Sequence, residues 1–487
     1  MNYELSDPDP RLVNDDIRPV PLAERHWTVM SMASLWVGMV VCVPTYMLAG
    51  GLIEQGMSWS QAVMTVMLGN VVVLAPMILN GHPGTKYGIP FPVLARASFG
   101  IHGAPIPSLL RAIVACGWFG IQTWVGGSAI YQLLNVMAAG ALTGAPLPVL
   151  GINAAQTGCF LAFWGIQVYF IYKGVESIRI FEQLAAPFLI LMGLALLAWA
   201  YVEADGFGPM MDRPSAFAVG GPKEGKFLSV FFQSLTAMVG FWATLSLNIP
   251  DFTRYAKSQR DQILGQAIGL PTTMTLFAFI GVAVTGATVV IYGEAIWDPT
   301  DLLGKMGGGM TVVISLFALS VATLSTNLAA NVVSPANAMI NVNPRKISFR
   351  LGGYVTAGLG LAMFPWKLLE STGDYIFTWL IGYSALLGPI GGILIADYFI
   401  VRRRRLHLPD LFRYEGRYWY RGGFNWIAVI SLVVAVLPNL PGFLHAAGIV
   451  DTVAPVFDTI YTYAWFVGFL LAGSLYVALM PDPGLES

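Results

Sequence analysis

Long apolar runs recur along almost the whole chain, and they constrain its fold more than any other feature of the sequence. Between Trp27 and Met480, stretches of about 18 to 25 predominantly apolar residues alternate with polar connections. Each stretch is long enough to cross the ~30 Å hydrocarbon core of a bilayer as a helix. Backbone N–H and C=O groups cannot stay unpaired in lipid, so the runs must be helical unless protein surrounds them. The sequence therefore predicts an all-α integral membrane protein.

Composition supports this prediction and argues against a soluble protein. Only 11% of the 487 residues are charged and 56% are hydrophobic, whereas a soluble globular protein carries about a quarter charged residues. The three cysteines, Cys42, Cys116 and Cys159, are isolated in apolar segments, where we expect them to act as small buried hydrophobes. No metal-ligand spacing, P-loop or dinucleotide fingerprint occurs. We therefore expect no enzyme activity and no cofactor.

We predict twelve membrane-spanning helices. They cover 27–52, 58–79, 104–135, 155–173, 182–202, 228–249, 264–292, 310–335, 350–364, 374–400, 424–441 and 458–480. The first 26 residues form a polar tail that lacks the features of a cleavable signal peptide. The chain then divides into five spans at 27–202, five more at 228–400, a basic loop at 401–423 and two last spans at 424–480.

The distribution of Lys and Arg predicts the orientation of the chain. Of the 26 Lys and Arg residues, 21 fall on the side that holds both termini and five on the other side. Because cytoplasmic loops carry the excess of Lys and Arg, we expect both termini in the cytoplasm and the chain in the inner (plasma) membrane. The run Arg402–Arg405 fits a topology anchor after a span better than a site for nucleic acid or anionic lipid.

Two spans at matching positions are interrupted. The first span carries Gly38 and Pro44 near its middle, and the sixth carries Gly240 followed by the polar stretch 244–248. These two are the first spans of the successive groups of five. Interrupted helices at corresponding positions in two halves indicate a binding site near the middle of the membrane in transporters built from inverted repeats.

The third span places an aromatic ring and an amide on one face. Trp118 and Gln122 are four residues apart, so they lie on the same side of a helix. A flat indole beside a primary amide suits a planar ligand with urea-like edges, because the ring stacks and the amide offers a donor and an acceptor. In the sixth span, Trp242, which follows Phe241, is a candidate for a second aromatic wall. The alternative is that these side chains only pack between helices.

The eighth span carries a cluster of amides and hydroxyls. Asn327 and Asn331 lie four residues apart, and amides in the middle of a span are costly unless they bond a ligand or another helix. Ser325 and Thr326 lie beside them, after the small residue Ala322. Hydroxyl and freed carbonyl oxygens are the ligands that an alkali cation requires, although hydroxyls also form hydrogen bonds between helices. We interpret the cluster as a polar lining.

Charged residues are rare inside the spans, which bears on the ligand. Asp251 follows the sixth span, and an ion pair with Arg254 one turn later is the favoured interpretation over a proton-carrying role. The centres of the spans named above contain no Lys, Arg, Asp or Glu, and the five histidines lie in loops or at span ends. A charged substrate would lack a counter-ion, so we expect a neutral ligand.

Four motifs resemble the nucleobase:cation symporter family, whose members include a bacterial hydantoin transporter, allantoin permeases, fungal uracil permeases and a plant plastid nucleobase transporter. The motifs are GWFGIQTW at 117–124, NIPDFTRYAKSQ at 248–259, ATLSTNLAANVVSPA at 322–336 and LIGYSALLGPIGG at 380–392. The last three are most similar to the plant plastid member and its bacterial relatives. The resemblance extends from about Pro19 to Val477.

This resemblance implies a leucine-transporter fold, with two inverted five-helix repeats, broken helices 1 and 6, and two extra C-terminal helices. It also implies roles for residues in two sites. The substrate residues would be Trp118 and Trp242 on the ring, Gln122 and Asn331 on its edges, and Phe241, Asn327 and Cys42 nearby. The sodium ligands would be the carbonyls of Gly38 and Val41 with Ala322, Ser325 and Thr326. Tyr383, between Gly382 and Ser384 in the tenth span, is a candidate gating residue.

Two departures from the family pattern concern the substrate and the coupling ion. The hydantoin transporter has a glutamine and allantoin permeases an asparagine where this chain has Cys42, which weakens the case for those ligands. The plant member has a glutamate where this chain has Gln122. The hydroxyls of the sodium site are present, which favours sodium, whereas plant and fungal relatives are thought to use protons. Sodium and protons both remain open.

We therefore predict a secondary active transporter that imports uracil or a related nucleobase by cation-coupled symport and alternating access. Allantoin or hydantoin in the same site is the first alternative. A receptor that binds its ligand without carrying it, and a uniporter or channel, are alternatives of other classes. We expect the chain to function as a monomer in the lipid bilayer.

Overall fold

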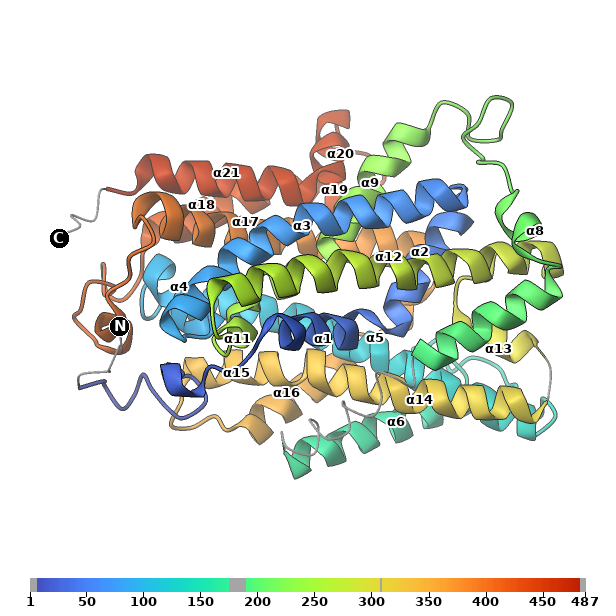
Figure 1. Ribbon diagram of the computed structural model, residues 1–487, viewed down its shortest axis with the longest axis horizontal. Coiled ribbons are helices and arrows are strands. Elements are labelled where there is room, and N and C mark those ends of the chain that lie inside the picture. Colours follow the sequence, from blue (N-terminus) through green and yellow to red (C-terminus); the bar gives the residue numbers. More distant parts are fainter. Residues whose placement is uncertain (1–6, 175–189, 307–308, 482–487) are drawn as a thin grey trace.

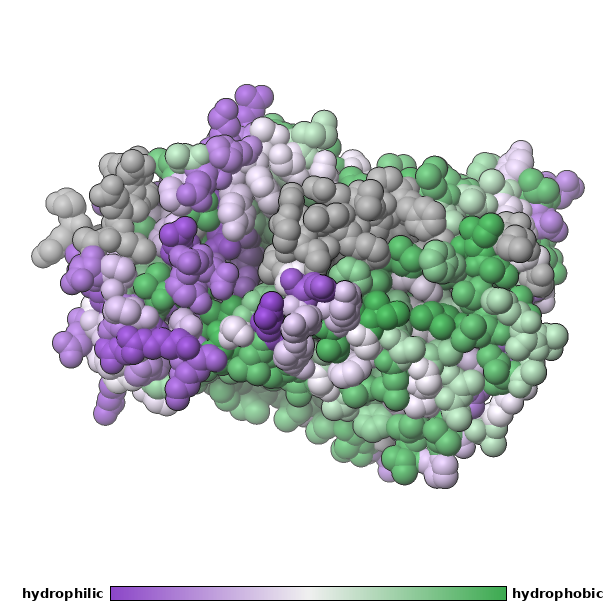
Figure 2. Space-filling model, turned by 90° about the horizontal axis from the view of Figure 1, so that it is seen from below, coloured by the Kyte–Doolittle hydropathy of each residue, from purple (hydrophilic) through white to green (hydrophobic). Residues whose placement is uncertain are grey.

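The computed structural model describes residues 7–174, 190–306 and 309–481. Its helices lie side by side along the long axis of the molecule, and the two ends of the described chain, near residues 7 and 481, lie at one end, which we call the terminal end (Figure 1). Hydrophilic residues gather toward this end, and hydrophobic residues cover much of the remaining face in Figure 2. Large apolar side chains are exposed on the helices, including Leu276 (70%), Leu470 (63%) and Phe317 (62%). Such a surface suits contact with lipid, because soluble proteins rarely expose large contiguous apolar areas.

The elements follow one another in a simple order. The α-helices are α1 (Val29–Val40), α2 (Val43–Glu54), α3 (Trp59–Tyr87), α4 (Phe91–Phe99), α5 (Pro105–Met137), α6 (Ala154–Lys173), a helix at Ile190–Glu203, α8 (Phe207–Met211), α9 (Phe227–Phe241), α10 (Ala243–Asn248), α11 (Pro250–Thr253), α12 (Gln259–Tyr292), α13 (Pro299–Lys305), α14 (Met310–Asn331), α15 (Val333–Val342), α16 (Phe349–Ala362), α17 (Ile381–Ile395), α18 (Trp426–Val436), α19 (Leu440–Ala446), α20 (Pro455–Thr462) and α21 (Ala464–Leu479). Short 3-10 helices are η1 (Leu22–Glu24), η2 (Lys367–Leu369), η5 (Leu408–Phe412) and η6 (Leu437–Asn439), and π-helical segments η3 (Asp374–Leu380) and η4 (Ala396–Val401) flank α17.

The predicted all-helical architecture is confirmed over the described residues, where β-pairing is limited to two isolated bridges. Seven of the described helices are long and apolar enough to cross a membrane, and two bent helix pairs raise the number to nine. The shorter apolar helices Ile190–Glu203 and Phe227–Phe241 coincide with the predicted fifth and sixth spans. Part of the predicted fifth span, 182–189, lies outside the described residues. The count of twelve spans and the inverted repeat stay predictions.

The first span breaks between its two predicted weak points. α1 and α2 meet at Val41 and Cys42 with a bend of 62°. Pro44 lies in the first turn of α2, where a missing N–H costs nothing. In a continuous helix the carbonyls of Gly38 and Val41 would accept from the N–H groups of Cys42 and Thr45, but these bond the carbonyls of Val40 and Cys42 instead. The break therefore leaves the Gly38 and Val41 carbonyls without their helical partners.

The sixth span breaks at Trp242, which lies between the end of α9 and the start of α10. Two residues earlier, Gly240 packs against α17. A Cβ atom on Gly240 would lie 2.8 Å from the carbonyl oxygen of Leu380 and 3.0 Å from Cβ of Ser384. The absence of a side chain therefore lets the broken sixth span approach the backbone at the start of the tenth.

The helices pack in three groups that meet around the two breaks. α12 contacts α1, α2 and α3, whereas α5 packs against α6, α14, α15 and α16. α17 packs against α9, α18 and α21, so the last two spans are attached to the tenth. This arrangement brings α5 into contact with α10 and α14, and α1 into contact with α14.

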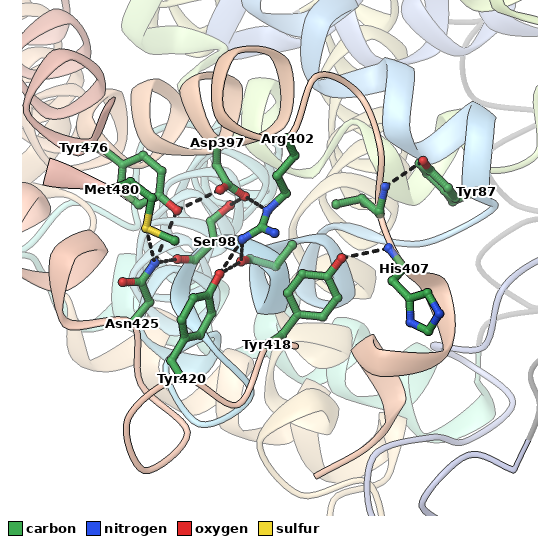
Figure 3. Close-up of polar contacts among 12 residues, drawn as sticks. Tyr87, Ser98, Asp397, Arg402, His407, Tyr418, Tyr420, Asn425, Tyr476 and Met480 are labelled. Carbon is green, nitrogen blue, oxygen red and sulfur yellow. Dashed lines mark hydrogen bonds and ion pairs between the residues drawn. The ribbon is translucent and has the colours of Figure 1, made fainter. Parts of the chain in front are cut away.

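A buried polar cluster, which we call the Asp397 hub, joins the tenth span to its neighbours at the terminal end (Figure 3). The Asp397 carboxylate pairs with Nε of Arg402 at 2.8 Å and accepts from the hydroxyls of Ser98 (2.9 Å) and Tyr476 (2.7 Å). Asn425 donates to the carbonyl of Ser98 at 2.7 Å. Burial disfavours the charged form of Arg402, but the Asp397 carboxylate outweighs burial and raises the pKa of Arg402. The hub therefore fastens α4, η4, the basic loop and α21 to one another.

The described part of the predicted tail, residues 7–26, packs against the same end of the molecule. The buried Arg96 guanidinium donates to the carbonyls of Leu12 (3.0 Å) and Leu411 (2.9 Å). The N–H of Asp9 donates to the carbonyl of Phe412 at 2.8 Å, and Ile17 is fully buried. These residues thus form part of a small apolar cluster with the basic loop rather than a separate polar tail.

Candidate functional site

A small cavity of about 40 Å³ lies where the two broken spans face α5 and α14. It is lined by Met39, Cys42 and Pro44 from the first span, Trp118 and Gln122 from α5, Phe241, Trp242, Thr244 and Leu245 from the sixth span, and Thr326, Ala330 and Asn331 from α14. The structure therefore brings six of the seven predicted substrate residues to one cavity, and Asn327 lies outside the lining. No lining residue carries a formal charge.

The aromatic rings around the cavity hold one another edge to face. Phe241 contacts Trp118 with ring centroids 5.2 Å apart and an interplanar angle of 76°, and it contacts Trp242 at 5.0 Å and 83°. Trp242 also meets Trp36 at 5.2 Å and 89°. Edge-to-face pairs each contribute about 0.5–1.5 kcal/mol beyond their burial. Phe241 thus fixes both predicted ring-binding tryptophans, and Trp36, which the sequence did not single out, fixes Trp242 from the other side.

Two buried polar atoms at the cavity have no hydrogen-bond partner among the described residues. They are the side-chain oxygen Oε1 of Gln122 and the indole N–H of Trp242, and both side chains line the cavity. A buried polar group left without a partner costs about 1–3 kcal/mol. A ligand that offers one N–H donor and one acceptor would remove both costs. The cavity thus combines apolar aromatic walls with one unpaired acceptor and one unpaired donor.

Asn327 lies behind the lining and connects three helices. Its Nδ2 donates to the carbonyl of Phe119 at 3.0 Å and to Oε1 of Gln167 at 2.7 Å. Its Oδ1 accepts from Nδ2 of Asn331 at 2.9 Å. Asn327 thus lies in the layer that supports Asn331, and its predicted contact with the ligand stays a prediction. Gln167 was not predicted, because a lone glutamine in an apolar span gives no sign of which helix it will face.

The predicted cation residues are split between the first span and α14. Gly38 and Val41 offer the two carbonyls freed by the break in the first span. Thr326 is buried and lines the cavity. Ala322 and Ser325 lie in α14, but their side chains fall outside the described part of the structure. Carbonyl and hydroxyl oxygens are the uncharged hard ligands that suit an alkali cation.

Asp251 lies away from the cavity, near the terminal end of the sixth span. Its carboxylate accepts from the backbone N–H of Phe91 at 2.8 Å and, at 3.4 Å each, from Asn248 and Ser334. The favoured ion pair with Arg254 is absent from the described residues, because the Arg254 guanidinium donates to the carbonyl of Asp16 (2.8 Å) and the hydroxyl of Tyr255 (2.9 Å). Asp251 is thus held chiefly by neutral donors.

A second buried charge near Asp251 was not predicted. Arg111, in the second turn of α5, is 1% exposed and donates from Nε to Oδ1 of Asn248 at 3.2 Å. Asn248 in turn donates to Asp251, so the two charged groups are linked through one amide. A basic residue near the end of a long apolar helix usually indicates the orientation of that helix in the membrane. The sequence therefore did not predict that Arg111 faces the interior of the bundle.

Tyr383 lies on α17 and is buried against the aromatic cluster. Its ring lies 6.3 Å from that of Trp118 and 5.0 Å from that of Trp379, centroid to centroid. Trp118 also meets Tyr375 and Trp379, each at 6.2 Å. The tenth span therefore covers one side of Trp118 with aromatic rings. Its predicted gating role stays a prediction.

A model of the family described as "Permease for cytosine/purines, uracil, thiamine, allantoin" matches residues 19–468. The chain belongs to this permease family. The permease is 47% identical over 484 residues to the purine-uracil permease NCS1 of Arabidopsis thaliana, covering 99% of this chain and 80% of that protein. It is 41% identical over 472 residues to the allantoin permease of Bacillus subtilis (strain 168), covering 96% and 93% of the two chains. The predicted nucleobase:cation symporter family is confirmed.

A solved structure supports the fold of the permease. The inward-facing conformation of Mhp1 matches with a TM-score of 0.78 and 26% identity, over 97% of this chain and 94% of Mhp1. The predicted leucine-transporter-like helical membrane fold is confirmed by this match and by the apolar helices described above. The permease is accordingly a membrane transporter and not an enzyme.

Proposed function

We propose that this permease imports uracil or a closely related nucleobase by cation-coupled symport. The observation that carries the proposal is the cavity between the two broken spans, where the unpaired Gln122 Oε1 and Trp242 N–H lie among aromatic rings. A planar ring with an N–H and a carbonyl on its edge supplies the donor and the acceptor that these atoms lack. Trp118 and Trp242 provide the apolar surface for its faces.

The lining explains why the substrate is neutral. None of the residues around the cavity is charged, and a charged ligand would lose its hydration there without gaining a counter-ion.

The alternating-access mechanism follows from the position of the cavity. Substrate lies at the breaks in the first and sixth spans, and the opposite wall belongs to α5 and α14. Rocking of the bundle that contains the first and sixth spans against the third and eighth spans opens the cavity to one side of the membrane and then to the other. Tyr383 and the aromatic rings of the tenth span cover Trp118 and act as a gate over the site.

Ion coupling follows from the same breaks. The freed carbonyls of Gly38 and Val41 belong to the first span, and Thr326 belongs to α14, so a cation bound between them would join the two moving parts. This arrangement favours sodium. A proton is the alternative, with the buried Asp251 as its carrier, because burial disfavours the charged form of a carboxylate.

A ureide is the second candidate substrate. The Bacillus subtilis relative is named an allantoin permease, and a solved Mhp1 structure holds bromovinylhydantoin. Allantoin and hydantoin also present N–H and carbonyl groups on a small ring. Cys42 lines the cavity, and its thiol lies 3.3 Å from the hydroxyl of Thr45, so it supplies no amide for a ureide.

The proposal places the permease in the plasma membrane with the terminal end in the cytoplasm. Arg402–Arg405 lie at this end, and hydrophilic residues gather toward it (Figure 2). The positive-inside rule then orients the molecule. We propose that the monomer is the transporting unit, because the cavity-lining aromatic and amide side chains are buried inside its own helical bundle.

Uptake by proteoliposomes tests the proposal. Labelled uracil is offered under an inward sodium gradient, under an inward proton gradient and with no gradient, with unlabelled allantoin, hydantoin or adenine as competitors. Concentrative uracil uptake with one gradient supports symport and names the ion. Uptake that only equilibrates, whatever the gradient, identifies a uniporter, and binding without uptake identifies a receptor. Uptake of allantoin but not uracil assigns the ureide.

A further inference from the structure

The amide of Asn331 has a defined orientation, and the orientation originates at one backbone carbonyl. The carbonyl oxygen of Phe119 can only accept hydrogen bonds. It accepts from the hydroxyl of Thr123 at 2.6 Å and from Asn327 at 3.0 Å. The group of Asn327 that faces Phe119 must therefore be its NH₂, and the Thr123 hydroxyl proton is already used.

The next two amides follow from this carbonyl. Because the Thr123 hydroxyl donates its proton to Phe119, its oxygen accepts from Nε2 of Gln167 at 2.8 Å. Oε1 of Gln167 then faces Asn327 and accepts from its Nδ2 at 2.7 Å. Thr123, Gln167 and Asn327 are all fully buried, so water does not compete for these bonds.

The last amide of the series belongs to the cavity lining. Oδ1 of Asn327 accepts from Nδ2 of Asn331 at 2.9 Å, which assigns the NH₂ of Asn331 to Asn327. The polar atom that Asn331 has left for the cavity is therefore its carbonyl oxygen Oδ1. A flip of the Asn331 amide would place its carbonyl oxygen against the carbonyl oxygen of Asn327.

We infer that Gln167 is a positioning residue that holds Asn331 with its carbonyl oxygen toward the cavity, so that the transported ring must present an N–H at this point. This inference rests on the proposed function and adds a requirement to it. A ring whose edge offers an acceptor or a methyl group to Asn331 is rejected, because the Asn331 oxygen would then lose its partner in a dry site. Gln167 lies on α6 (Ala154–Lys173) and is not among the cavity-lining residues.

The test compares ligands that differ in one N–H. Dissociation constants of uracil, 1-methyluracil and 3-methyluracil are measured with the purified full-length permease. In the wild type, methylation of the nitrogen that faces Asn331 should weaken binding by about tenfold or more, since it leaves a buried acceptor unpaired. Gln167→Met keeps the length of the side chain but removes the acceptor Oε1, so Asn327 and Asn331 are held in this orientation chiefly through the Phe119 carbonyl. The free-energy cost of turning both amides falls by about one buried hydrogen bond, and this discrimination should fall severalfold.

The controls separate positioning from a general effect on stability. Gln266 is also fully buried, but it bonds Gln262 on α12 and is not among the cavity-lining residues, so Gln266→Met should leave the discrimination unchanged. Thr123→Val removes the hydroxyl that orients Gln167 and replaces the test if Gln167→Met does not fold. If Gln167→Met or Thr123→Val weakens the binding of uracil and of its methyl derivative by the same factor, the discrimination between them is unchanged and the inference is overturned.

The design also distinguishes failure of this inference from failure of the proposed function. If uracil does not bind to the wild type, the uracil assignment is wrong, and the same comparison is made with hydantoin and its 1-methyl and 3-methyl derivatives. If Gln167→Met lowers the ratio between the dissociation constants of the methyl derivative and of hydantoin, the result supports the orientation of Asn331. If this ratio is the same in the wild type and in Gln167→Met, the result contradicts it.

Discussion

At the scale of single residues, Cys42 lines the cavity but has only weak means of recognising a polar ligand. It lies at the break in the first span, buried, with its thiol 3.3 Å from the hydroxyl of Thr45. A thiol is a weak hydrogen-bond donor and acceptor. Gln122 and Asn331, which also line the cavity, carry amides that bond a ligand more strongly.

We therefore predict that Cys42→Ala changes the affinity for uracil by about 0.5 kcal/mol or less, as expected for loss of a weak polar contact. Equilibrium binding to the purified variant checks this value. Cys42→Ser, which keeps a small polar side chain, serves as the matched control. A loss beyond tenfold in the alanine variant would mean that Cys42 contacts the ligand directly, which would reopen the ureide assignment.

Sequence reasoning located most lining residues but not the layer behind them. Trp118, Gln122, Phe241, Trp242 and Asn331 were found because aromatic and amide side chains stand out in apolar spans. The supporting roles of Gln167 and Trp36 depend on which helices become neighbours, and periodicity along one helix does not contain that information. The same reason explains why the contacts of Asn327 with Gln167 and Phe119 were not predicted.

At the scale of the elements, the close approach of the sixth and tenth spans depends on Gly240. A Cβ atom there would lie 2.8 Å from the backbone oxygen of Leu380, which cannot move away without shifting the start of α17. We predict that Gly240→Ala lowers the free energy of unfolding by about 1–3 kcal/mol, as overpacking does. Gly358→Ala, on the exposed face of α16 with no atom within 4 Å of the new Cβ, is the control. Equal thermal stability of both variants would contradict the packing described here.

The Asp397 hub yields a second prediction at this scale. Asp397→Asn leaves the buried Arg402 without its counter-charge, and breaking a buried ion pair by removing one partner costs about 3–5 kcal/mol. Tyr476→Phe removes only one hydrogen bond to the same carboxylate, at a cost of about 1 kcal/mol. The melting temperature of the purified protein should therefore fall much further in the aspartate variant. A reversed order would show that the ion pair contributes little and that Tyr476 is the main link between α21 and the tenth span.

The sequence predicted where helices lie along the chain better than it predicted how they meet one another. Apolar runs located helices that the structure places at similar residues, and Gly38 with Pro44 bracketed the break at Val41 and Cys42. The bend of 86° between α20 and α21 was not foreseen. No glycine or proline lies at Tyr463, where the two helices meet, so the sequence offers no local signal for it.

At the scale of the whole molecule, symport requires that the ion and the substrate stabilise the same state. If a cation binds between the first span and α14, uracil and the cation must raise each other's affinity by the same factor. We predict that uracil binds more tightly either when sodium replaces choline at fixed pH or when the pH is lowered without sodium. Thr326→Ala should abolish the sodium effect if sodium is the coupling ion. Binding of uracil that ignores both ions would contradict symport while leaving the fold intact.

The whole account depends on the cavity between the broken spans being the substrate site. Uracil binding to purified Trp118→Ala protein, compared with Trp426→Ala, tests this most directly. Trp118 is buried in the aromatic cluster, whereas Trp426 is 50% exposed on α18. We predict a loss of at least about 2 kcal/mol in affinity for Trp118→Ala, a value typical of a buried aromatic contact that dominates binding, and no change for Trp426→Ala. Wild-type affinity in a folded Trp118→Ala protein would contradict the site.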